Sequence, residues 1–557
     1  MNHKKNKLTI WDTSENFVNY PKNIQKIYLN FYVKERIKFT DWIGKISIPY
    51  KDNLDWWSSP PASRNLYLSD LYKNICIIKT VDLLKKKNSL PHMLITNSIA
   101  LKKILERRNI KILINVPFLY QPIFKKIFFL LKTTKTLFLF LFKFIILNIL
   151  IKKRNYIPKK IILIDTYITD CKKKEERFYG SSFSKKICKI NKIYFVPTII
   201  QNKIFEFFKI ALELKKYNKY LFKESYVNIS DVFYCFFYIL RRNYFLTKYM
   251  NYNKFNLTDL IHEELKYISN MDLVFLSLMN YSFAKRLKDN SIIVKKSINW
   301  FENQPCDKGW NLGFAKYFKN IILLGYQGFS VYPEYMCLNV SKSELAARVI
   351  PDKIIITSNS FKVFRKEFCK KIKIITGPAL RKHSIKKKYT QRKYKVVIFL
   401  EGLLNGYDNH VIEKFIRIAK KNLDINFYIK SHPNLPLREY NYELPKNLIE
   451  TNIDFSKLAS NTEVAVSYGS SSCTLESIEH GCKILIPIDN PFDEMVLRSL
   501  KISRRIYDIC PTFQTLDKYF TKFIIKSNKT FTFNSNNIMN NNNIFKKKNL
   551  VNFKMFL

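Results

Sequence analysis

Glycine is scarce in this chain, with only 11 glycines among 557 residues. The familiar glycine-containing catalytic motifs are missing, because the chain has no GxxxxGK[ST] phosphate loop and no GxSxG nucleophile turn. It also lacks an HExxH helix and a D-x-D pair of the metal–diphosphate type. We therefore expect no dedicated metal site, and any phosphate binding must use other residues.

Paired cysteines and a signal peptide are also absent. The ten cysteines are scattered along the chain with no CxxC pair, so neither zinc spacing nor a disulfide framework is supported. The N-terminus, MNHKKNKLTIWDTSENF, is positively charged but has no apolar core of signal-peptide length. These absences predict a reduced protein that faces the cytoplasm.

Acidic residues are few: 44 aspartates and glutamates stand against 96 lysines and arginines, for a net charge of +52. Much of this excess matches a composition rich in Lys, Ile, Asn, Phe and Tyr, with lysines spread from end to end. The charge still favours a phosphorylated ligand or an anionic membrane surface. Nucleic acid is not an expected partner, because no surface module that interleaves aromatic and basic residues is recognisable.

Long apolar runs are confined to residues 125–154, KKIFFLLKTTKTLFLFLFKFIILNILIKKR. The nearly unbroken run from Thr136 to Ile151 contains Lys143 and is shorter than the roughly 20 residues of a membrane-spanning helix. On a helix, four lysines fall within an arc of about 80° beside a Phe/Leu/Ile face: Lys125, Lys132, Lys135 and Lys143. The pattern predicts a helix lying in the membrane interface; a buried helix between domains is the alternative.

Apolar strand-like runs alternate with helical segments along most of the chain. In the first half these runs cover residues 159–168, 192–200, 319–333 and 351–360. In the second half they cover residues 372–378, 394–402, 425–434, 462–472 and 482–491. Valine- and isoleucine-rich strands with helices between them are typical of parallel sheets covered on both faces.

The chain is therefore expected to be an α/β protein with two doubly wound Rossmann-like domains facing a cleft. Residues 1–365 would form the first, acceptor domain, carrying the interfacial helix of about 125–154 and a helical insertion of about 201–290. Residues 366–528 would form the second, nucleotide-sugar domain. An asparagine- and lysine-rich low-complexity tail, 529–557, follows.

The segment 468–491, YGSSSCTLESIEHGCKILIPIDNP, places Ser470, Ser471 and Ser472 between a predicted strand and a predicted helix. Backbone N–H groups at a helix start are unpaired and positively polarised, so they can bind a phosphate. The serine hydroxyls add donors, and Glu476, one turn further on, could accept hydrogen bonds from ribose hydroxyls. Simple N-capping by serine, with Glu476 in solvent, is the alternative.

Two further predicted strands end in polar residues. In YIKSHPN, the strand ends at Lys430, and Pro433 restrains His432 to an extended conformation in which it could contact a phosphate. In VVIFLEGLLNGYDN, Glu401 ends a strand and could deprotonate an acceptor hydroxyl, with Asp408 as a weaker substitute. A structural histidine and a solvated or capping carboxylate are the alternatives at these two positions.

In this order, these residues resemble GT-B glycosyltransferases of bacterial surface-carbohydrate (capsule and O-antigen) synthesis. Residues 394–510 look like the nucleotide-sugar domain of the polysialyltransferase and capsule-transferase type, which pairs an acidic-acidic-glycine motif with a His-Pro motif and a later serine pair. The resemblance implies that Glu401 is the general base, although Leu400 stands where a second acidic residue is often found. It also implies that His432, Ser471 and Ser472 contact the donor phosphate.

The same resemblance implies that Glu476 holds the ribose. A second resemblance, to a narrower family described only as surface carbohydrate biosynthesis proteins, involves four segments of the first half: residues 52–65, 161–180, 298–305 and 324–333. That family often has a histidine after Gly-Tyr-Gln, where this chain has Gly328. Glu302, at a predicted strand end facing the cleft, is the candidate for acceptor contact, with a structural carboxylate as the alternative.

Together these features predict a metal-independent GT-B-type glycosyltransferase, peripheral on the inner face of the plasma membrane. It would transfer a sugar from a nucleotide-sugar donor to a lipid-linked or growing glycan of a surface polysaccharide, with no cofactor besides that donor. Its expected partners are the nucleotide-sugar, the glycan acceptor and an anionic membrane surface. Two alternatives stay open: a non-catalytic GT-B-like scaffold in a polysaccharide assembly complex, and a polyol-phosphate transferase of the teichoic-acid type.

Overall fold

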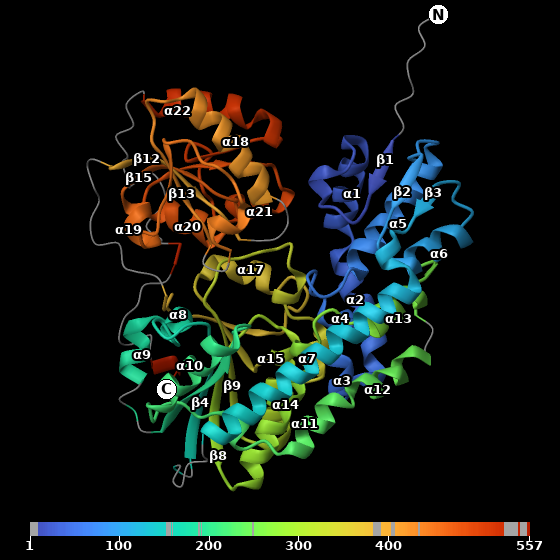
Figure 1. The fold of residues 1–557 in the computed structure, drawn as a ribbon, viewed down its shortest axis with the longest axis vertical. Helices are drawn as coiled ribbons and strands as arrows, with labels where there is room; N and C mark the ends of the chain where they lie inside the picture. Colours follow the sequence, from blue (N-terminus) through green and yellow to red (C-terminus); the bar gives the residue numbers. More distant parts are fainter. Residues whose placement is uncertain are drawn as a thin grey trace, which may run out of the picture.

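Two six-stranded parallel sheets form the two main bodies of the protein (Figure 1). The computed structural model describes residues 9–151, 158, 160–187, 190, 192–247, 250–381, 392–402, 407–432, 435–528, 544–545 and 554–556. The first sheet contains β4 (Lys160–Ile168), β5 (Ile193–Ile199), β8 (Ile293–Trp300), β9 (Ile322–Gln327), β10 (Lys353–Ile356) and β11 (Lys373–Thr376). The second contains β12 (Tyr394–Phe399), β13 (Phe427–Lys430), β14 (Leu448–Glu450), β15 (Thr462–Val466), β16 (Lys483–Ile486) and β17 (Tyr507–Ile509).

Both sheets are covered on both faces, which explains why their strands are continuously apolar. Val396, Val397 and Ile398 are successive residues of β12 and point to alternate faces, yet all three are fully buried. The second sheet is flanked by α18 (Tyr407–Lys421), α19 (Phe455–Ser460), α20 (Ser472–Glu479), α21 (Pro491–Ser499) and α22 (Leu516–Asn528). The prediction of two doubly wound α/β domains is confirmed.

The strand order locates a switch point in each sheet. The second sheet has the order β14-β13-β12-β15-β16-β17, so the chain reverses direction across the sheet between β12 and β15. The first has the order β11-β10-β9-β8-β4-β5, with the reversal between β4 and β8. In open parallel sheets, ligands bind beyond the carboxyl ends of the strands at such a point.

The helical elements of the first domain differ in detail from the sequence prediction. They are α8 (Glu176–Tyr179), α9 (Ser181–Ile187), α10 (Ile204–Lys215), α11 (Ile229–Phe236), α12 (Tyr238–Arg241), α13 (Thr258–Lys266), α14 (Met271–Asp289), α15 (Pro305–Tyr317), α16 (Lys342–Ala346) and α17 (Lys362–Arg365). A short hairpin, β6 (Asn251–Tyr252) with β7 (Phe255–Asn256), lies within the expected helical insertion. Strand β11 pairs with β10, so the first sheet extends beyond residue 365, where the sequence prediction ended the first domain.

The N-terminal residues form a third, smaller layer that the sequence did not reveal. Three short parallel strands, β1 (Ile10–Asp12), β2 (Met93–Ile95) and β3 (Leu113–Asn115), form one sheet. It is accompanied by α1 (Lys22–Lys34), α2 (Arg36–Ser47), α3 (Leu54–Trp57), α4 (Pro60–Ser63), α5 (Leu71–Lys86) and α6 (Ile99–Arg107). Strands of three residues carry too little periodicity to be recognised in a sequence.

The predicted tail, 529–557, lies mostly outside the described residues. Two short pieces of it are described, and both pack against the body of the protein. Phe545 contacts Phe361, with ring centroids 5.9 Å apart. Phe556 is fully buried beside Tyr326, with ring centroids 5.6 Å apart, so the end of the chain returns to the first domain (Figure 1).

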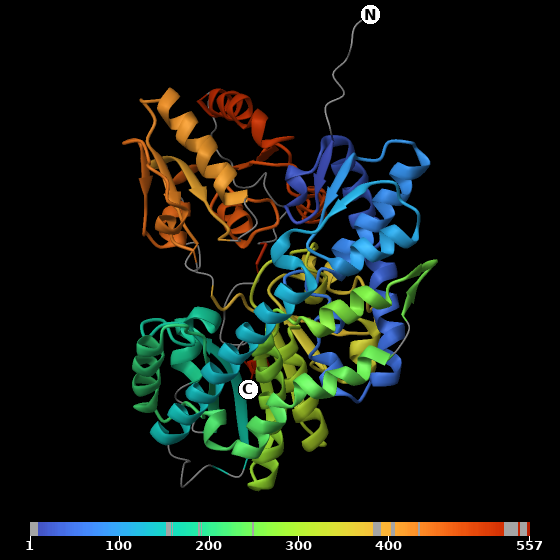
Figure 2. The same ribbon diagram turned by 45° about the vertical axis from the view of Figure 1, so that its right-hand side comes forward.

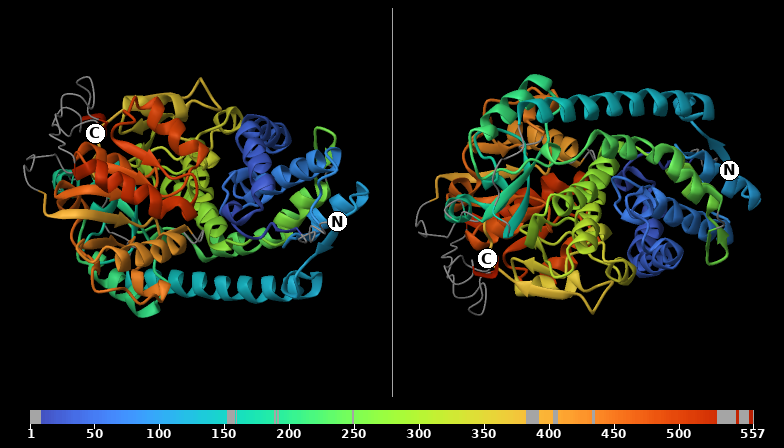
Figure 3. Two further views of the ribbon diagram at one scale, coloured as in Figure 1. Left: turned by 90° about the horizontal axis from the view of Figure 1, so that it is seen from above. Right: turned by 90° about the horizontal axis from the view of Figure 1, so that it is seen from below.

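The predicted interfacial helix is α7 (Pro122–Leu150), 29 residues long. It lies along the outside of the first domain, as the rotated views show (Figures 2 and 3). Two lysines of the predicted stripe are turned toward the protein: Lys125 pairs with Glu263 at 2.8 Å, and Lys143 donates to the Gln201 carbonyl at 2.7 Å. Half of the predicted lysine stripe therefore fastens the helix to the domain, while Lys132 and Lys135 are exposed.

Candidate functional site

The switch points of the two sheets lie on facing sides of the two domains (Figures 1 and 2). Beyond β12 and β15 the second domain presents Glu401 and the loop Ser470–Ser472, which we call the serine loop. Beyond β4 and β8 the first domain presents α8 and Glu302. Because ligands of such sheets bind at these ends, the space between them is the candidate site.

The structure brings the predicted Glu401 and His432 motifs into contact. Gly402 has a φ of 67°, a left-handed conformation that favours glycine. A Cβ atom at Gly402 would lie 2.3 Å from the Cβ of His432, so only glycine allows the turn after β12 to approach the histidine this closely. The Leu400 N–H also donates to the Lys430 carbonyl at 3.1 Å, which joins the ends of β12 and β13.

Asp408 holds this turn in place and is not exposed as a substitute base. It is buried at the start of α18. One carboxylate oxygen accepts from the N–H of Glu401 at 3.2 Å, and the other from the N–H of Gly402 at 2.8 Å. The hydroxyls of Tyr468 and Tyr440 complete its hydrogen bonds at 3.0 and 2.8 Å. Asp408 is therefore a positioning residue for Glu401, which corrects its interpretation as a weaker base.

Glu401 lies among other acids. Burial raises its pKa well above the usual value, and the nearby carboxyls of Glu334, Asp493 and Asp408 raise it further. Glu334, from the first domain, has its pKa raised to about 8, chiefly by burial and then by Asp493. The pKa of Asp493 is raised to about 6 by burial, although Ser470 donates to it. Carboxyls with raised pKa values at a strand end are typical of acid–base sites, where a higher pKa makes the carboxylate a stronger base.

Sequence reasoning did not identify Glu334 or Asp493. Asp493 lies in the first turn of α21, the helix that follows β16, so its position after a strand end was a usable signal. Glu334 is in an irregular loop after β9, and no local pattern indicated that it would face the second domain.

His432 and Lys430 lie at the carboxyl end of β13, as predicted. Burial lowers the pKa of His432, and the neighbouring Arg177 and Arg381 of the first domain lower it further, against the opposing effect of Asp408. The imidazole is therefore neutral at physiological pH and can donate one hydrogen bond. Burial also lowers the pKa of Lys430.

The serine loop has the geometry of a helix N-cap, which was the alternative to a phosphate site. Ser471 is the N-cap of α20, and its hydroxyl accepts from the Thr474 N–H at 3.1 Å. The N–H groups predicted to be unpaired have partners: Ser470 donates to Asp493 at 3.0 Å, and Ser472 donates to the Tyr332 hydroxyl at 3.2 Å. The expectation of free amide groups at this helix start is therefore wrong for these two residues. Glu476 lies half-buried one turn further along the helix.

Residues of the first domain cover the serine loop. The Ser330 hydroxyl donates to the Ser470 carbonyl at 2.6 Å, and the Ser330 N–H donates to the Ser472 hydroxyl at 3.2 Å. Arg365, which is buried, donates to the Ser330 carbonyl at 3.0 Å and holds this covering loop. A phosphate could reach the amide of Ser472 only after Tyr332 and Ser330 move away.

Gly328 stands where the surface carbohydrate biosynthesis family that the sequence resembles often has a histidine, and the structure shows what fills the space around it. A Cβ atom at Gly328 would lie 2.5 Å from the Trp300 ring. The buried indole therefore fills the space that a larger side chain would need. Glycine at this position is a packing requirement of this chain.

Glu302 follows β8, at the predicted strand end. Its carboxylate accepts from the Trp300 indole N–H at 2.7 Å, and its own N–H donates to Asp307 at 3.1 Å. Burial raises the pKa of Glu302, while the Trp300 hydrogen bond and the charge of Arg381 act in the opposite direction. The carboxylate is thus engaged within its own domain, and its contact with an acceptor stays a prediction.

Within the described part of the chain, no group of three or more His, Cys, Asp or Glu side chains could hold a metal ion.

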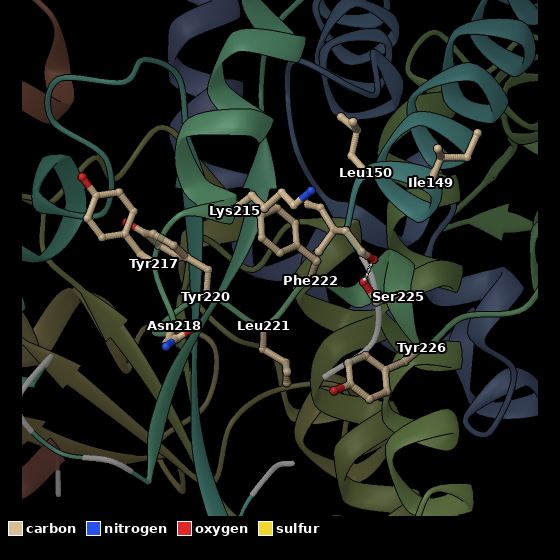
Figure 4. A pocket seen from close by; sticks show the side chains of 11 residues that line it. Ile149, Leu150, Lys215, Tyr217, Asn218, Tyr220, Leu221, Phe222, Ser225 and Tyr226 are labelled. Atoms are coloured by element: carbon tan, nitrogen blue, oxygen red, sulfur yellow. Dashed lines mark hydrogen bonds between the residues drawn. The ribbon is translucent and has the colours of Figure 1, made fainter. Parts of the chain in front are cut away.

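A pocket between the C-terminal end of α7 and the residues after α10 is lined by Leu150, Lys215, Phe222 and Tyr226, among others (Figure 4). It does not adjoin the strand ends at which parallel sheets bind ligands.

Comparison with known proteins gives only distant likenesses. No protein-family model and no curated protein sequence matches the chain. A glycosyltransferase of kitacinnamycin is 13% identical over 67% of this chain and 91% of its own, with a TM-score of 0.34. UDP-GlcNAc 2-epimerase from Neisseria meningitidis, solved with UDP-GlcNAc, is 14% identical over 66% and 91%, with a TM-score of 0.36. The UDP-GlcNAc 2-epimerase from Methanocaldococcus jannaschii, in complex with UDP-GlcNAc and UDP, is 13% identical over 70% and 96%, with a TM-score of 0.38. The fold described above follows from this chain's own strand order.

Proposed function

We propose that the protein is a glycosyltransferase of the GT-B type, which takes a sugar from a nucleotide-sugar and adds it to a glycan or lipid-linked acceptor of a surface polysaccharide. The observation that carries the proposal is the convergence of Glu401, His432 and the serine loop at the switch point of the second sheet. The strand order of that sheet is the one found in dinucleotide-binding folds. The resemblance of residues 394–510 to nucleotide-sugar domains supports the same conclusion.

The roles of the residues follow from their surroundings. Glu401, whose pKa is raised by burial and by neighbouring carboxyls, would take the proton of the acceptor hydroxyl as it attacks the anomeric carbon. The neutral His432 would donate a hydrogen bond to the departing phosphate, and Lys430 would add positive charge. Asp408 would keep Glu401 in place through the backbone of the turn.

A non-catalytic scaffold is the second candidate, and one observation favours it. The serine loop is covered by Ser330 and Tyr332 of the first domain, which hydrogen-bond to the hydroxyl and the N–H of Ser472 that a donor phosphate would need. In an enzyme this loop must open for the donor, whereas in a scaffold it could stay closed.

Thermal unfolding with nucleotides distinguishes the two candidates. The full chain is heated with CMP, UDP, GDP or CDP and with their sugar conjugates, because a ligand of the native state raises the melting temperature. We expect stabilisation by one nucleotide that is lost in His432→Ala and in Ser471→Ala/Ser472→Ala. Ser460→Ala, two residues before β15 and so at the amino ends of the strands, is the matched control and should keep it. No stabilisation by any nucleotide would contradict the transferase and favour the scaffold.

We also propose that the protein works on the cytoplasmic face of the plasma membrane, with α7 lying in the lipid interface. The side of α7 that faces away from the domain is apolar and exposed: Leu131 is 66% exposed, Phe138 68% and Ile149 72%. At 100° per residue these three lie on one face of the helix. The exposed Lys132 and Lys135 border that face, and α7 has no acidic residue, as an anionic lipid surface requires.

The attachment of α7 favours a helix lying on the membrane over one crossing it. By length and composition α7 could span a bilayer, since an 18-residue window has a mean hydropathy of 1.7. Its inner face, however, is joined to the first domain at both ends, by Lys125 with Glu263 and by the Asn148 amide with the Glu224 carbonyl at 2.9 Å. The adjacent α10 adds Phe205, which is 77% exposed.

Vesicle binding tests this location. We expect the full chain to sediment with vesicles containing phosphatidylglycerol, and Leu131→Glu/Phe138→Glu to remain in the supernatant. Val363→Glu, an exposed apolar residue on α17, is the matched control and should bind like the unaltered protein. Equal vesicle binding by all three proteins would overturn the role of α7.

A further inference from the structure

Two arginines of the first domain meet at its switch point, and none of the roles proposed so far uses them. Arg177 lies in α8, on the connection that follows β4, and Arg381 lies five residues after β11. Although β11 and β4 are separated by three strands, the chain brings the two residues together.

The chain geometry that brings them together is well defined. The Tyr326 hydroxyl donates to the Pro378 carbonyl at 3.0 Å and accepts from the Leu380 N–H at 2.9 Å, so residues 378–380 are held across β9. Gly180, at the end of α8, has a φ of 71°, and a Cβ there would lie 2.1 Å from the Leu380 carbonyl oxygen and 3.4 Å from the Arg381 Cα. The segments that carry the two arginines are therefore in backbone contact.

The side chains of both arginines stay at this end of the sheet. The Arg381 guanidinium lies over the Trp300 ring, 5.5 Å from its centroid, at the end of β8. Arg177 donates to the Thr169 hydroxyl, one residue beyond β4. The two guanidinium groups are thus placed at the ends of the two strands that define the switch point, β4 and β8.

Each of the two arginines has one acidic neighbour. These neighbours are Asp170 beside Arg177 and Glu302 beside Arg381. Asp170 also accepts from the N–H groups of Lys172 and Lys173, both at 2.8 Å, and Glu302 accepts from Trp300. His432 of the second domain is close enough that the charges of Arg177 and Arg381 lower its pKa. Two guanidinium groups near each other at a ligand-binding edge are a matching partner for an anion, which they can bind through paired N–H donors.

We propose that Arg177 and Arg381 form an anion site in the first-domain half of the cleft, opposite His432, for a phosphate or carboxylate group of a substrate. The site rests on the proposed function and specifies its substrate: one of the two substrates carries a negative group that the first domain binds. That group is either the diphosphate of the donor or an anionic group of the acceptor, such as a uronic-acid carboxylate or a lipid-linked phosphate.

Direct binding measurements on the full chain test the site. The probes are inorganic pyrophosphate and glucuronate, measured calorimetrically with the unaltered protein, Arg177→Gln, Arg381→Gln and the double variant. At least one probe should bind the unaltered protein. Each single variant should bind that probe about tenfold more weakly, because it loses a charge-assisted hydrogen bond worth about 1.4 kcal/mol. The double variant should bind it more weakly still. Arg107→Gln, an exposed arginine far from the cleft, is the matched control and should bind like the unaltered protein.

The outcomes separate the sources of the anion. Weaker binding of pyrophosphate and of the stabilising nucleotide in the arginine variants assigns the site to the donor. Weaker binding of glucuronate with unchanged nucleotide binding assigns it to the acceptor. Equal binding of both probes by all variants, or no binding of either by the unaltered protein, overturns the anion site. Nucleotide stabilisation of the unaltered protein would persist in that case, so failure of this site differs from failure of the transferase proposal.

Discussion

Acidic side chains are withdrawn from solvent in two regions of the protein, and their pKa values are shifted in opposite directions in the two regions. Between the N-terminal layer and the first domain, Glu344 pairs with Arg64 at 2.7 Å and with Lys308 at 3.1 Å, and both partners are almost fully buried. Burial alone would raise the pKa of Glu344, but the two cations lower it below the usual value. Where the two domains meet, Glu401, Glu334 and Asp493 lie close together and their pKa values are all raised.

The difference distinguishes structural charges from candidate functional ones. A buried carboxylate between two cations is compensated within the fold and holds two layers together. The half-buried Glu401 and Glu334 and the buried Asp493 are not compensated in this way, so their protons are held more tightly, which acid–base chemistry can use.

The largest effect is expected in the compensated region. Glu344→Gln leaves Arg64 and Lys308 buried beside a neutral side chain, and loss of one partner of a buried ion pair typically costs about 3–5 kcal/mol. Urea unfolding of the full chain should show this loss as a lower midpoint. Glu106→Gln, which removes an exposed pair with Lys102, should change the free energy of unfolding by about 0.5 kcal/mol or less. A midpoint for Glu344→Gln within the range of this control would show that the network is not structural.

A smaller effect is expected where the Glu401 turn meets His432. Gly402→Ala forces a left-handed backbone on alanine and moves the turn away from the imidazole, at a cost of about 1–3 kcal/mol. Nucleotide stabilisation should be lost together with this stability. Gly481→Ala, with a φ of 81° at the end of α20, is the control for the backbone cost alone. Nucleotide binding retained by Gly402→Ala would remove the turn from the donor site.

The pH dependence of stability should reveal the raised pKa values in the cleft. A carboxyl whose pKa is higher in the folded than in the unfolded protein stabilises the fold at low pH, and this stability is lost as the pH rises through the folded pKa. For Asp493 and Glu334 the pKa rises from 3.8 to about 6 and from 4.5 to about 8, so the loss falls between about pH 4 and about pH 8. The melting temperature should fall across this range, and Glu334→Gln should reduce the fall. An identical pH profile for Glu334→Gln would contradict the raised pKa of Glu334.

The smallest effect is expected at the start of α20. Ser471→Ala removes the hydroxyl that accepts from the Thr474 N–H, and loss of an N-cap costs about 1 kcal/mol. The melting temperature of this variant, without ligand, should therefore fall slightly. Cys473→Ala, one residue into the helix, leaves the cap intact and serves as the control. Equal melting temperatures for the two variants would show that Ser471 does not cap the helix.

Much of the architecture could be predicted from the sequence. Valine- and isoleucine-rich runs indicated most strands of both sheets, because strands covered on both faces must be apolar throughout. Strands β14 and β17, only three residues each, were missed, as was the three-stranded N-terminal sheet. Lys125 and Lys143 belong to the predicted lysine stripe but face the domain, because helical periodicity groups residues by face without saying which face the rest of the protein covers.

The sequence by itself determined where the polar residues of the candidate site stand along the chain: Glu401, Lys430 and His432 at strand ends, and Ser471 at a helix start. These placements follow from local patterns of apolarity, turn residues and capping. Only the tertiary structure decided which groups face them: Asp408 beneath the Glu401 turn, Tyr332 on the amide of Ser472, and Arg381 near His432. The order of strands in a sheet and the contact between two domains join residues far apart in sequence, and no local pattern encodes those distances.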